Sequence, residues 1–294
     1  MTVEECRRFY AEGIKLAANI QSDSLIEAFA RVPREEFLGP GPWKIATMGS
    51  GLGRPTYVET PDADPRHLYH NLLVSLDASR DLNNGEPAGL AKWINALDLK
   101  RGDRMYHLGC GVGYYTAIIA EVVGADGHVL ASEFDVDLAA RAKSNLAGYA
   151  NVSVQSGDGL VVELGKRNAI FINAGVTHPH LKWLESLPEG GRLVLPLTVS
   201  LGAGMSPNLG SGVMAKFTRV GNDFSGQIVT PVAIFACIGM RNPEKEQGLR
   251  DAIRAGKLLK MHSLRRDNHE SSETCILHGT DTCLSTIEVP ATPA

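Results

Sequence analysis

Apolar and polar residues follow helical spacing at the start of the chain and then lose any regular period. Up to about Phe37 the apolar spacing predicts helices, with a cap at Ser22 or Asp23 before the segment SLIEAFARV. Residues 38–65 are dense in Gly and Pro, so we expect a long irregular loop of the kind that forms a lid or a substrate wall. Helical spacing returns in residues 86–99.

The middle of the chain alternates short strand-like runs with helix-like segments. In order, these segments are 105–109, 116–124, 127–133, 135–149, 151–157, 168–175, 180–187 and 191–197. Such alternation predicts an α/β fold with a doubly wound, mostly parallel sheet. Runs at 213–220, 227–239 and 273–279 are β-rich and predict antiparallel strands, and residues 251–262 predict another helix. We therefore expect a helical cap with a lid loop at 1–75, a ligand-binding core at 76–240 and a C-terminal β-rich extension at 241–294.

Composition narrows the classes of partner. The chain has 294 residues, 44% of them apolar, and a formal net charge of −4, so a sizeable core is expected and non-specific binding to nucleic acid or membrane is not favoured. Charges interrupt the apolar residues of the first 21 positions, which are unlike a signal peptide or a membrane span, and a cytoplasmic location is expected. The five cysteines are odd in number and scattered, which favours reduced thiols.

The strongest chemical signal is the glycine-rich segment between the run at 105–109 and the helical pattern that follows. Gly109, Gly111 and Gly113 leave the backbone open to a ligand, and the next helix offers free N–H groups at its N-terminus. This pattern predicts a nucleotide-like cofactor. The GxGxG spacing only approximates the GxGxxG of dinucleotide-binding folds, so a nicotinamide oxidoreductase is a distant alternative.

Two acidic residues follow successive predicted strands. Glu133 is placed to bind ribose hydroxyls, and Asp158 to accept a hydrogen bond from an adenine amino group. Taken alone, each has an ordinary alternative: Glu133 as a solvated acid before a helix, and Asp158 as a turn or cap residue.

The chain resembles class I S-adenosylmethionine-dependent methyltransferases, specifically the protein-L-isoaspartate O-methyltransferases. VPREEF at 32–37 is similar to the family's VPR-x-x-F, HLGCGVGYYTAIIA to its EIGTGSGYQAAVLA, and NVSVQSGDG to its third-strand GDG. The resemblance implies that S-adenosyl-L-methionine is the cofactor, with the three glycines around its methionine and ribose parts, Glu133 at ribose and Asp158 at adenine. Neighbouring positions complete the expected cofactor set: His107, Cys110, Gly159 and Asn173.

The acceptor side departs from the family pattern. The family's T-I-S-Q-P segment aligns with Asn83-Asn84-Gly85-Glu86-Pro87, which has no hydroxyl, and His107 replaces an acidic residue. Asn83 and Asn84 are our candidates for orienting a carboxylate acceptor, since a carboxylate is already ionised and needs no base; a simple NNG turn is the alternative. For a hydroxyl or amine acceptor, His178 is a candidate base, although a histidine next to proline is more often structural. His180 is a weaker candidate.

Several functions therefore stay open. The leading expectation is an O-methyltransferase acting on a protein or peptide carboxylate; the alternatives are a small-molecule O- or N-methyltransferase and a non-catalytic cofactor-binding module. Cys110 is expected to pack rather than react. The C-terminal residues His262, His269, Cys275, His278 and Cys283 have metal-binding side chains, but they lack a CxxC pair, so no metal site is expected. The sequence does not predict an oligomeric state.

Overall fold

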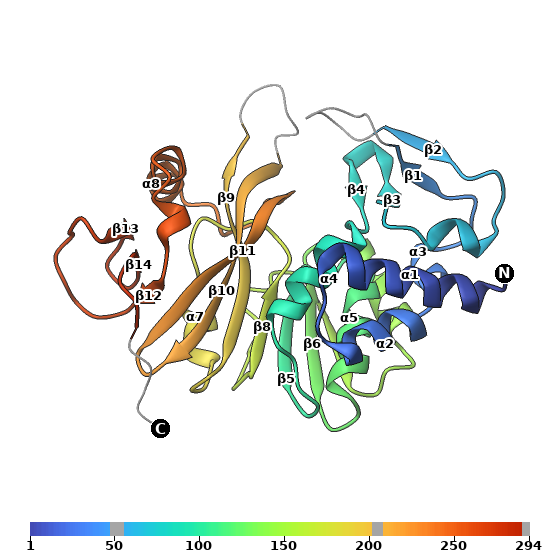
Figure 1. The fold of residues 1–294 in the computed structure, drawn as a ribbon, viewed down its shortest axis with the longest axis horizontal. Coiled ribbons are helices and arrows are strands. Elements are labelled where there is room, and N and C mark those ends of the chain that lie inside the picture. The colour runs from blue at the N-terminus through green and yellow to red at the C-terminus, as the bar shows by residue number, and fades with distance from the viewer. Residues whose placement is uncertain (48–55, 202–207, 290–294) are drawn as a thin grey trace. The chain divides into compact units, whose positions relative to one another are not determined.

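The computed structural model describes residues 1–47, 56–201 and 208–289 (Figure 1). The chain divides into two compact units, each described separately below. The first comprises Met1–Asp103 and Gly109–Gly159, and the second comprises Arg104–Leu108 and Leu160–Ala294. These units do not test the domain boundaries that the sequence predicts at residues 75 and 240, and those boundaries stay predictions.

The first unit begins with the predicted helices. They are α1 (Val3–Ala18), α2 (Asp23–Arg31) and α3 (Glu35–Leu38). Thr2 and Glu5 form a reciprocal capping box at the start of α1. The Ser22 side chain accepts a hydrogen bond from the Leu25 N–H at 3.3 Å and so caps α2, which decides between the two predicted caps.

A buried arginine from the VPREEF motif ties these helices to the segment that follows. The Arg34 side chain is fully buried and donates from Nη1 to the carbonyl of Leu68 at 2.8 Å and from Nη2 to that of Leu72 at 2.9 Å. Its guanidinium also lies 5.9 Å from the ring centres of Tyr10 and Tyr114. One side chain therefore joins α1, the 65–72 segment and the first turn of the helix after the glycines.

The segment predicted as an irregular loop contains short strands. β1 (Lys44–Ala46) and β2 (Tyr57–Glu59) pair antiparallel, and part of the predicted lid, residues 48–55, lies outside the described residues. Further elements follow it: the 3-10 helices η1 (Pro65–Leu68) and η2 (Ala78–Arg80), and the antiparallel pair β3 (Ser75–Asp77) and β4 (Leu82–Asn83). Strands of two or three residues are too short to leave a period-2 pattern in the sequence.

The rest of the first unit alternates helices and parallel strands as predicted. Its elements are α4 (Pro87–Ala96), α5 (Tyr114–Val123), β6 (His128–Glu133), α6 (Val136–Asn145) and β7 (Val152–Ser156). β6 and β7 are parallel, with Glu133 opposite Ser156 at their carboxyl ends. These ends bring the two predicted acidic segments to one edge.

The second unit contains parallel strands extended by a long antiparallel hairpin. β5 (Arg104–Leu108), β8 (Ala169–Ile172) and β9 (Arg192–Ser200) are parallel neighbours, and α7 (Leu181–Ser186) connects the last two. β10 (Leu209–Val220) and β11 (Asp223–Phe235) add antiparallel strands beside β9. The mixture of parallel core and antiparallel extension agrees with the predicted α/β class.

The C-terminal region of the second unit differs from the prediction at its helix. Helix α8 (Pro243–Arg254) begins eight residues before the predicted start at 251, because Asn242 caps it and Pro243 occupies its first position. It ends before Gly256, whose φ is +65°, and only the 3-10 turn η3 (Leu258–Lys260) follows. Three short strands complete the unit in the order β12 (Ser263–Arg265), β14 (Cys283–Ser285), β13 (Cys275–His278).

No helix within the described residues is long and apolar enough to cross a membrane.

Replacing Arg34 with lysine should destabilise the protein markedly. A lysine cannot reproduce the forked donation to several carbonyls, and it leaves buried acceptors without partners. We expect the free energy of unfolding to fall by about 2–4 kcal/mol, measured by urea denaturation. The control is Arg31→Lys, since the Arg31 side chain is 62% exposed in its ion pair with Glu121 and should cost less than about 1 kcal/mol. Equal losses of unfolding free energy in the two variants would contradict this role of the buried Arg34 side chain.

Candidate functional site

The glycine turn is fixed to the end of β6 by backbone hydrogen bonds. The N–H groups of Gly109 and Cys110 both donate to the Ser132 carbonyl, at 2.9 and 3.1 Å. The Gly113 N–H then donates to the Cys110 carbonyl at 3.0 Å, which closes the turn immediately before α5. These three bonds therefore define the path of the turn at the carboxyl end of a strand.

Gly111 and Gly113 in this turn require glycine for different structural reasons. Both have positive φ, +55° at Gly111 and +94° at Gly113. A Cβ at Gly113 would lie 2.8 Å from Leu146 Cδ1, so this glycine permits close packing against α6. A Cβ at Gly111 would meet no atom within 4 Å, so this position faces open space. Gly111 is the place where a ligand can approach the backbone.

Glu133 lies against the same turn. Its Oε2 accepts the Gly111 N–H at 2.8 Å, and its Oε1 accepts the Asp135 N–H at 3.1 Å. Burial raises the pKa of Glu133 from its ordinary value, opposed by these backbone donors. The carboxylate is thus oriented toward the turn and retains acceptor capacity, since each oxygen has a second lone pair.

Asp158 and Gly159 follow the neighbouring strand end. The Gly157 N–H donates to the Glu133 carbonyl at 2.8 Å, which fixes the start of this segment beside β6. Asp158 is exposed and Gly159 is buried. The predicted glycine, ribose and adenine positions therefore come together within the first unit.

The predicted acceptor segment also belongs to this unit. The Asn83 Oδ1 accepts the Gly85 N–H at 2.9 Å, which is the turn role considered from the sequence. The Asn84 N–H donates to the Val74 carbonyl at 2.9 Å, and the residue is 8% exposed. Its Nδ2 has no hydrogen-bond partner among the described residues. A buried donor in this state requires an explanation, and a bound ligand is one.

Tyr115, which sequence reasoning did not identify, connects this segment to the glycine turn. Its hydroxyl donates to the Gly85 carbonyl at 3.2 Å, and Tyr115 belongs to the first turn of α5. Glu86 supports the segment from the other side by capping α4 through the Gly89 N–H at 2.9 Å. A tyrosine within an apolar helix gives no sequence signal that separates this contact from ordinary packing.

The other candidates occupy buried or packed positions. His107 lies in β5 of the second unit, fully buried and stacked on Phe171 with ring centres 5.1 Å apart. Burial, followed by the charge of Glu133, raises the pKa of the Cys110 thiol well above its ordinary value, which agrees with the expected packing role. In the second unit, Asn173 follows β8 and donates its N–H to the Leu108 carbonyl at 2.8 Å.

His178 has a defined tautomer. The Thr177 hydroxyl donates to the Met240 carbonyl at 3.1 Å, so His178 Nδ1, 2.9 Å from that hydroxyl, is the donor to it. Burial, with smaller contributions from Lys245 and His180, lowers the pKa of His178 to about 4. The imidazole is therefore neutral at pH 7, with its lone pair on Nε2.

Comparison with known proteins decides the family. A model of the Protein-L-isoaspartate(D-aspartate) O-methyltransferase family matches residues 54–203. The protein-L-isoaspartate O-methyltransferase 1 of Archaeoglobus fulgidus is 31% identical over 201 residues, which cover 67% of this chain and 82% of that protein. The chain belongs to the protein-L-isoaspartate O-methyltransferase family. The corresponding protein of Thermotoga maritima is 30% identical over 186 residues, 61% of this chain but only 52% of the relative.

Solved structures support the fold. A protein-L-isoaspartate O-methyltransferase structure aligns with a TM-score of 0.61 at 23% identity, covering 84% of this chain and 69% of its own. A candidate protein-L-isoaspartate O-methyltransferase from Plasmodium falciparum, solved with S-adenosyl-L-homocysteine, aligns with a TM-score of 0.55 at 17% identity, covering 79% and 97%. Membership confirms the predicted resemblance, the α/β methyltransferase fold, the enzyme class and S-adenosyl-L-methionine as the cofactor. The individual site residues stay predictions.

Glu133→Gln should weaken cofactor binding without unfolding the turn. A glutamine oxygen still accepts the Gly111 N–H, but the charge-assisted bonds to ribose hydroxyls are lost. Such bonds contribute about 1.5–3 kcal/mol, so the Kd for S-adenosyl-L-methionine should rise about 10- to 100-fold in calorimetric titration. Glu163→Gln is the control, since that side chain is 94% exposed. Unchanged affinity in Glu133→Gln would contradict the assignment.

His107 should make stability depend on pH. Burial lowers the pKa of His107 to about 3, whereas the pKa of an imidazole in the unfolded chain is about 6.5. Between these values the unfolded chain binds the extra proton, so this contribution to stability is complete above pH 6.5 and is lost as the pH falls. His107→Gln should therefore flatten the acid-side slope by up to about 1.4 kcal/mol per pH unit, measured by urea unfolding from pH 4.5 to 7.5. The exposed His262→Gln is the control; an unchanged slope in His107→Gln would refute the prediction.

Proposed function

We propose that the protein transfers a methyl group from S-adenosyl-L-methionine to a carboxylate of a protein or peptide. Family membership supports the methyl donor and the class of reaction. The buried amide of Asn84 is the observation that carries the choice of acceptor. The sulfonium cofactor supplies an activated methyl group, and the contributions of this chain are binding, alignment and exclusion of water.

The residues present fit the proposed cofactor. The open position at Gly111 admits a ligand against the backbone, and Glu133 beside it has lone pairs for two ribose hydroxyls. Gly109 and Gly113 set the path of the turn, and Asp158 is the proposed partner of the adenine amino group. Asn173 and His107 stay proposed members of this set.

Asn84 is the proposed contact to the acceptor. An amide N–H orients a carboxylate without forming the strong ion pair that would reduce its nucleophilicity. Asn83 is the proposed support, since its oxygen holds the turn at Gly85. No general base is required, because the carboxylate charge and the sulfonium charge cancel as the ester and the thioether form.

A small-molecule hydroxyl or amine is the second candidate acceptor, and His178 is the candidate base for it. Its neutral imidazole, with the proton on Nδ1, has a lone pair on Nε2 that is able to accept a proton. Its lowered pKa of about 4 makes it a weak base, and this favours the carboxylate proposal. Retained cofactor affinity without turnover would indicate a non-catalytic cofactor-binding module.

The test combines an isoaspartyl peptide methylation assay with calorimetric titration of the cofactor. Asn84→Ala should lower kcat/KM about 10- to 100-fold, the loss of one hydrogen bond to a charged group, while the cofactor Kd stays unchanged. Asn84→Asp should lose more, since it places a negative charge against the acceptor. The exposed Asn222→Ala is the control.

The outcomes separate the alternatives. Wild-type kcat/KM in Asn84→Ala would refute the role of the amide. Cofactor binding by the wild-type protein without methylation of isoaspartyl peptides would refute the peptide acceptor and favour a small molecule.

A further inference from the structure

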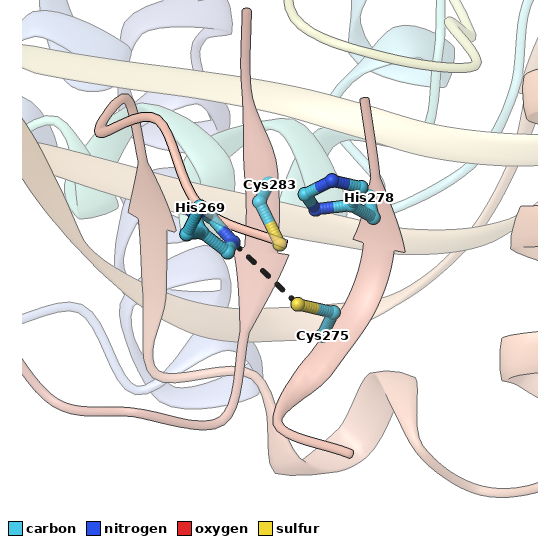
Figure 2. A group of neighbouring side chains, drawn as sticks. All are labelled: His269, Cys275, His278 and Cys283. Carbon is cyan, nitrogen blue, oxygen red and sulfur yellow. Dashed lines mark hydrogen bonds between the residues drawn. The ribbon is translucent and has the colours of Figure 1, made fainter. Parts of the chain in front are cut away.

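Two histidines and two cysteines meet in the C-terminal region of the second unit (Figure 2). They are His269, Cys275, His278 and Cys283, and their ligand atoms all lie within 4.8 Å of one another. From the sequence we expected no metal here, because the spacing H-x5-C-x2-H-x4-C lacks a CxxC pair. The cluster is created by strand pairing, which that spacing does not reveal.

A β-bulge places three of these side chains on one face. His278 lies opposite Cys283 in the antiparallel pair β13–β14, and Cys275 lies opposite Ser285. Cys283 and Ser285 are two residues apart and so share a face. In a regular strand Cys275 and His278, three apart, would face opposite sides, but the irregularity between Cys275 and Leu277 removes that difference.

His269 comes from the loop after β12 and is oriented by that loop. Its Nδ1 lies 3.0 Å from the Asp267 carbonyl oxygen, an acceptor, so Nδ1 carries the proton. Nε2 consequently has the lone pair, and it lies 3.5 Å from Cys275 Sγ (Figure 2). Arg265 in turn holds the Asp267 carboxylate, with 2.9 Å between Nε and Oδ1. A histidine whose second nitrogen donates to a fixed oxygen is typical of metal ligands.

The surroundings of Cys275 also suit a thiolate ligand. The Ser272 N–H donates to Cys275 Sγ at 3.4 Å, and the Ser272 hydroxyl lies 3.6 Å from the same sulfur. Cys275 and Cys283 are both buried, whereas His278 is exposed. The sulfurs are therefore shielded, while His278 leaves a path by which an ion can enter.

The separations match the size of a tetrahedral zinc site. With Zn–S bonds of about 2.3 Å and Zn–N bonds of about 2.0–2.1 Å, the edges of a tetrahedron are about 3.4–3.8 Å long. The 3.5 Å between His269 Nε2 and Cys275 Sγ falls in this range. The other separations between ligand atoms are at most 4.8 Å, so small side-chain movements bring them into the same range.

We propose that His269, Cys275, His278 and Cys283 bind one zinc ion in a closed, four-coordinate structural site. Two imidazoles and two thiolates form a donor set that zinc prefers, and four protein ligands leave no position for a substrate. On binding, the two thiols release their protons to solvent. The ion fixes strands of three, four and three residues, which offer little apolar surface of their own.

The test measures the metal content of the full-length protein purified without chelators from zinc-supplemented cells. We expect about one zinc per chain by elemental analysis, and little in Cys275→Ser and Cys283→Ser. Cys6→Ser is the matched control, since Cys6 is a free cysteine in α1, and it should keep the zinc. Wild-type protein without zinc that also fails to bind added Zn²⁺ would overturn the proposal.

A second measurement keeps the proposal testable if a cysteine variant fails to fold. Wild-type protein stripped of metal and titrated with Co²⁺ should develop the visible bands of tetrahedral cobalt together with near-ultraviolet thiolate-to-cobalt bands. Octahedral cobalt spectra, or a Cys275–Cys283 disulfide detected by mass spectrometry in protein purified under reducing conditions, would overturn it. None of these readouts depends on methyl transfer, so the failure of this proposal is distinguishable from that of the proposed function.

Discussion

The geometry of the candidate site depends on the carboxyl end of β6. The Ser132 carbonyl accepts two N–H groups of the glycine turn, and the Glu133 side chain accepts a third at 2.8 Å. The Glu133 carbonyl accepts the Gly157 N–H, also at 2.8 Å. Because these bonds originate from two consecutive residues, the turn, the proposed ribose acceptor and the start of the GDG segment are fixed relative to one another. The candidate site is thus held by backbone groups together with the Glu133 carboxylate.

A second set of contacts, centred on buried aromatic rings, links the cap to this site. The Tyr114 ring packs against Phe37 with ring centres 5.6 Å apart and lies beside the Arg34 guanidinium. The adjacent Tyr115 reaches Gly85 with its hydroxyl. Consecutive tyrosines at the start of α5 therefore contact the helical cap through the Tyr114 ring and the proposed acceptor segment through the Tyr115 hydroxyl. The helix that begins at the glycine turn thus contacts the residue that follows Asn84.

Local chemistry explains which features the sequence predicted. The Ser22 cap, the glycine turn and the alternation of strands and helices each depend on residues close together in the chain, and all three were recognisable. Arg34 was recognised only as part of a motif, because its carbonyl partners lie more than thirty residues away. The cluster of two histidines and two cysteines was not predictable for a related reason: an irregularity in β13 decides which side chains share a face, and no spacing rule includes it. The start of α8 has a local signal, Asn242-Pro243, but the apolar spacing of 251–262 predicted the helix too far toward the C-terminus.

The two parts of the candidate site, at Glu133 and at Asn84, differ in how far a change of side chain would affect the rest of the site. The Glu133 carboxylate accepts the Gly111 N–H of the glycine turn, so a replacement that loses this acceptor affects the turn as well as any ligand. The Asn84 Nδ2, by contrast, has no partner among the described residues, and the Asn84 backbone N–H donates to the Val74 carbonyl. A side chain at this position is therefore able to change without disturbing the cofactor turn. The absence of the family's hydroxyl in this segment is consistent with that freedom. Under the proposed roles, cofactor affinity depends on Glu133 and the choice of acceptor on Asn84, so neither property reports on the other.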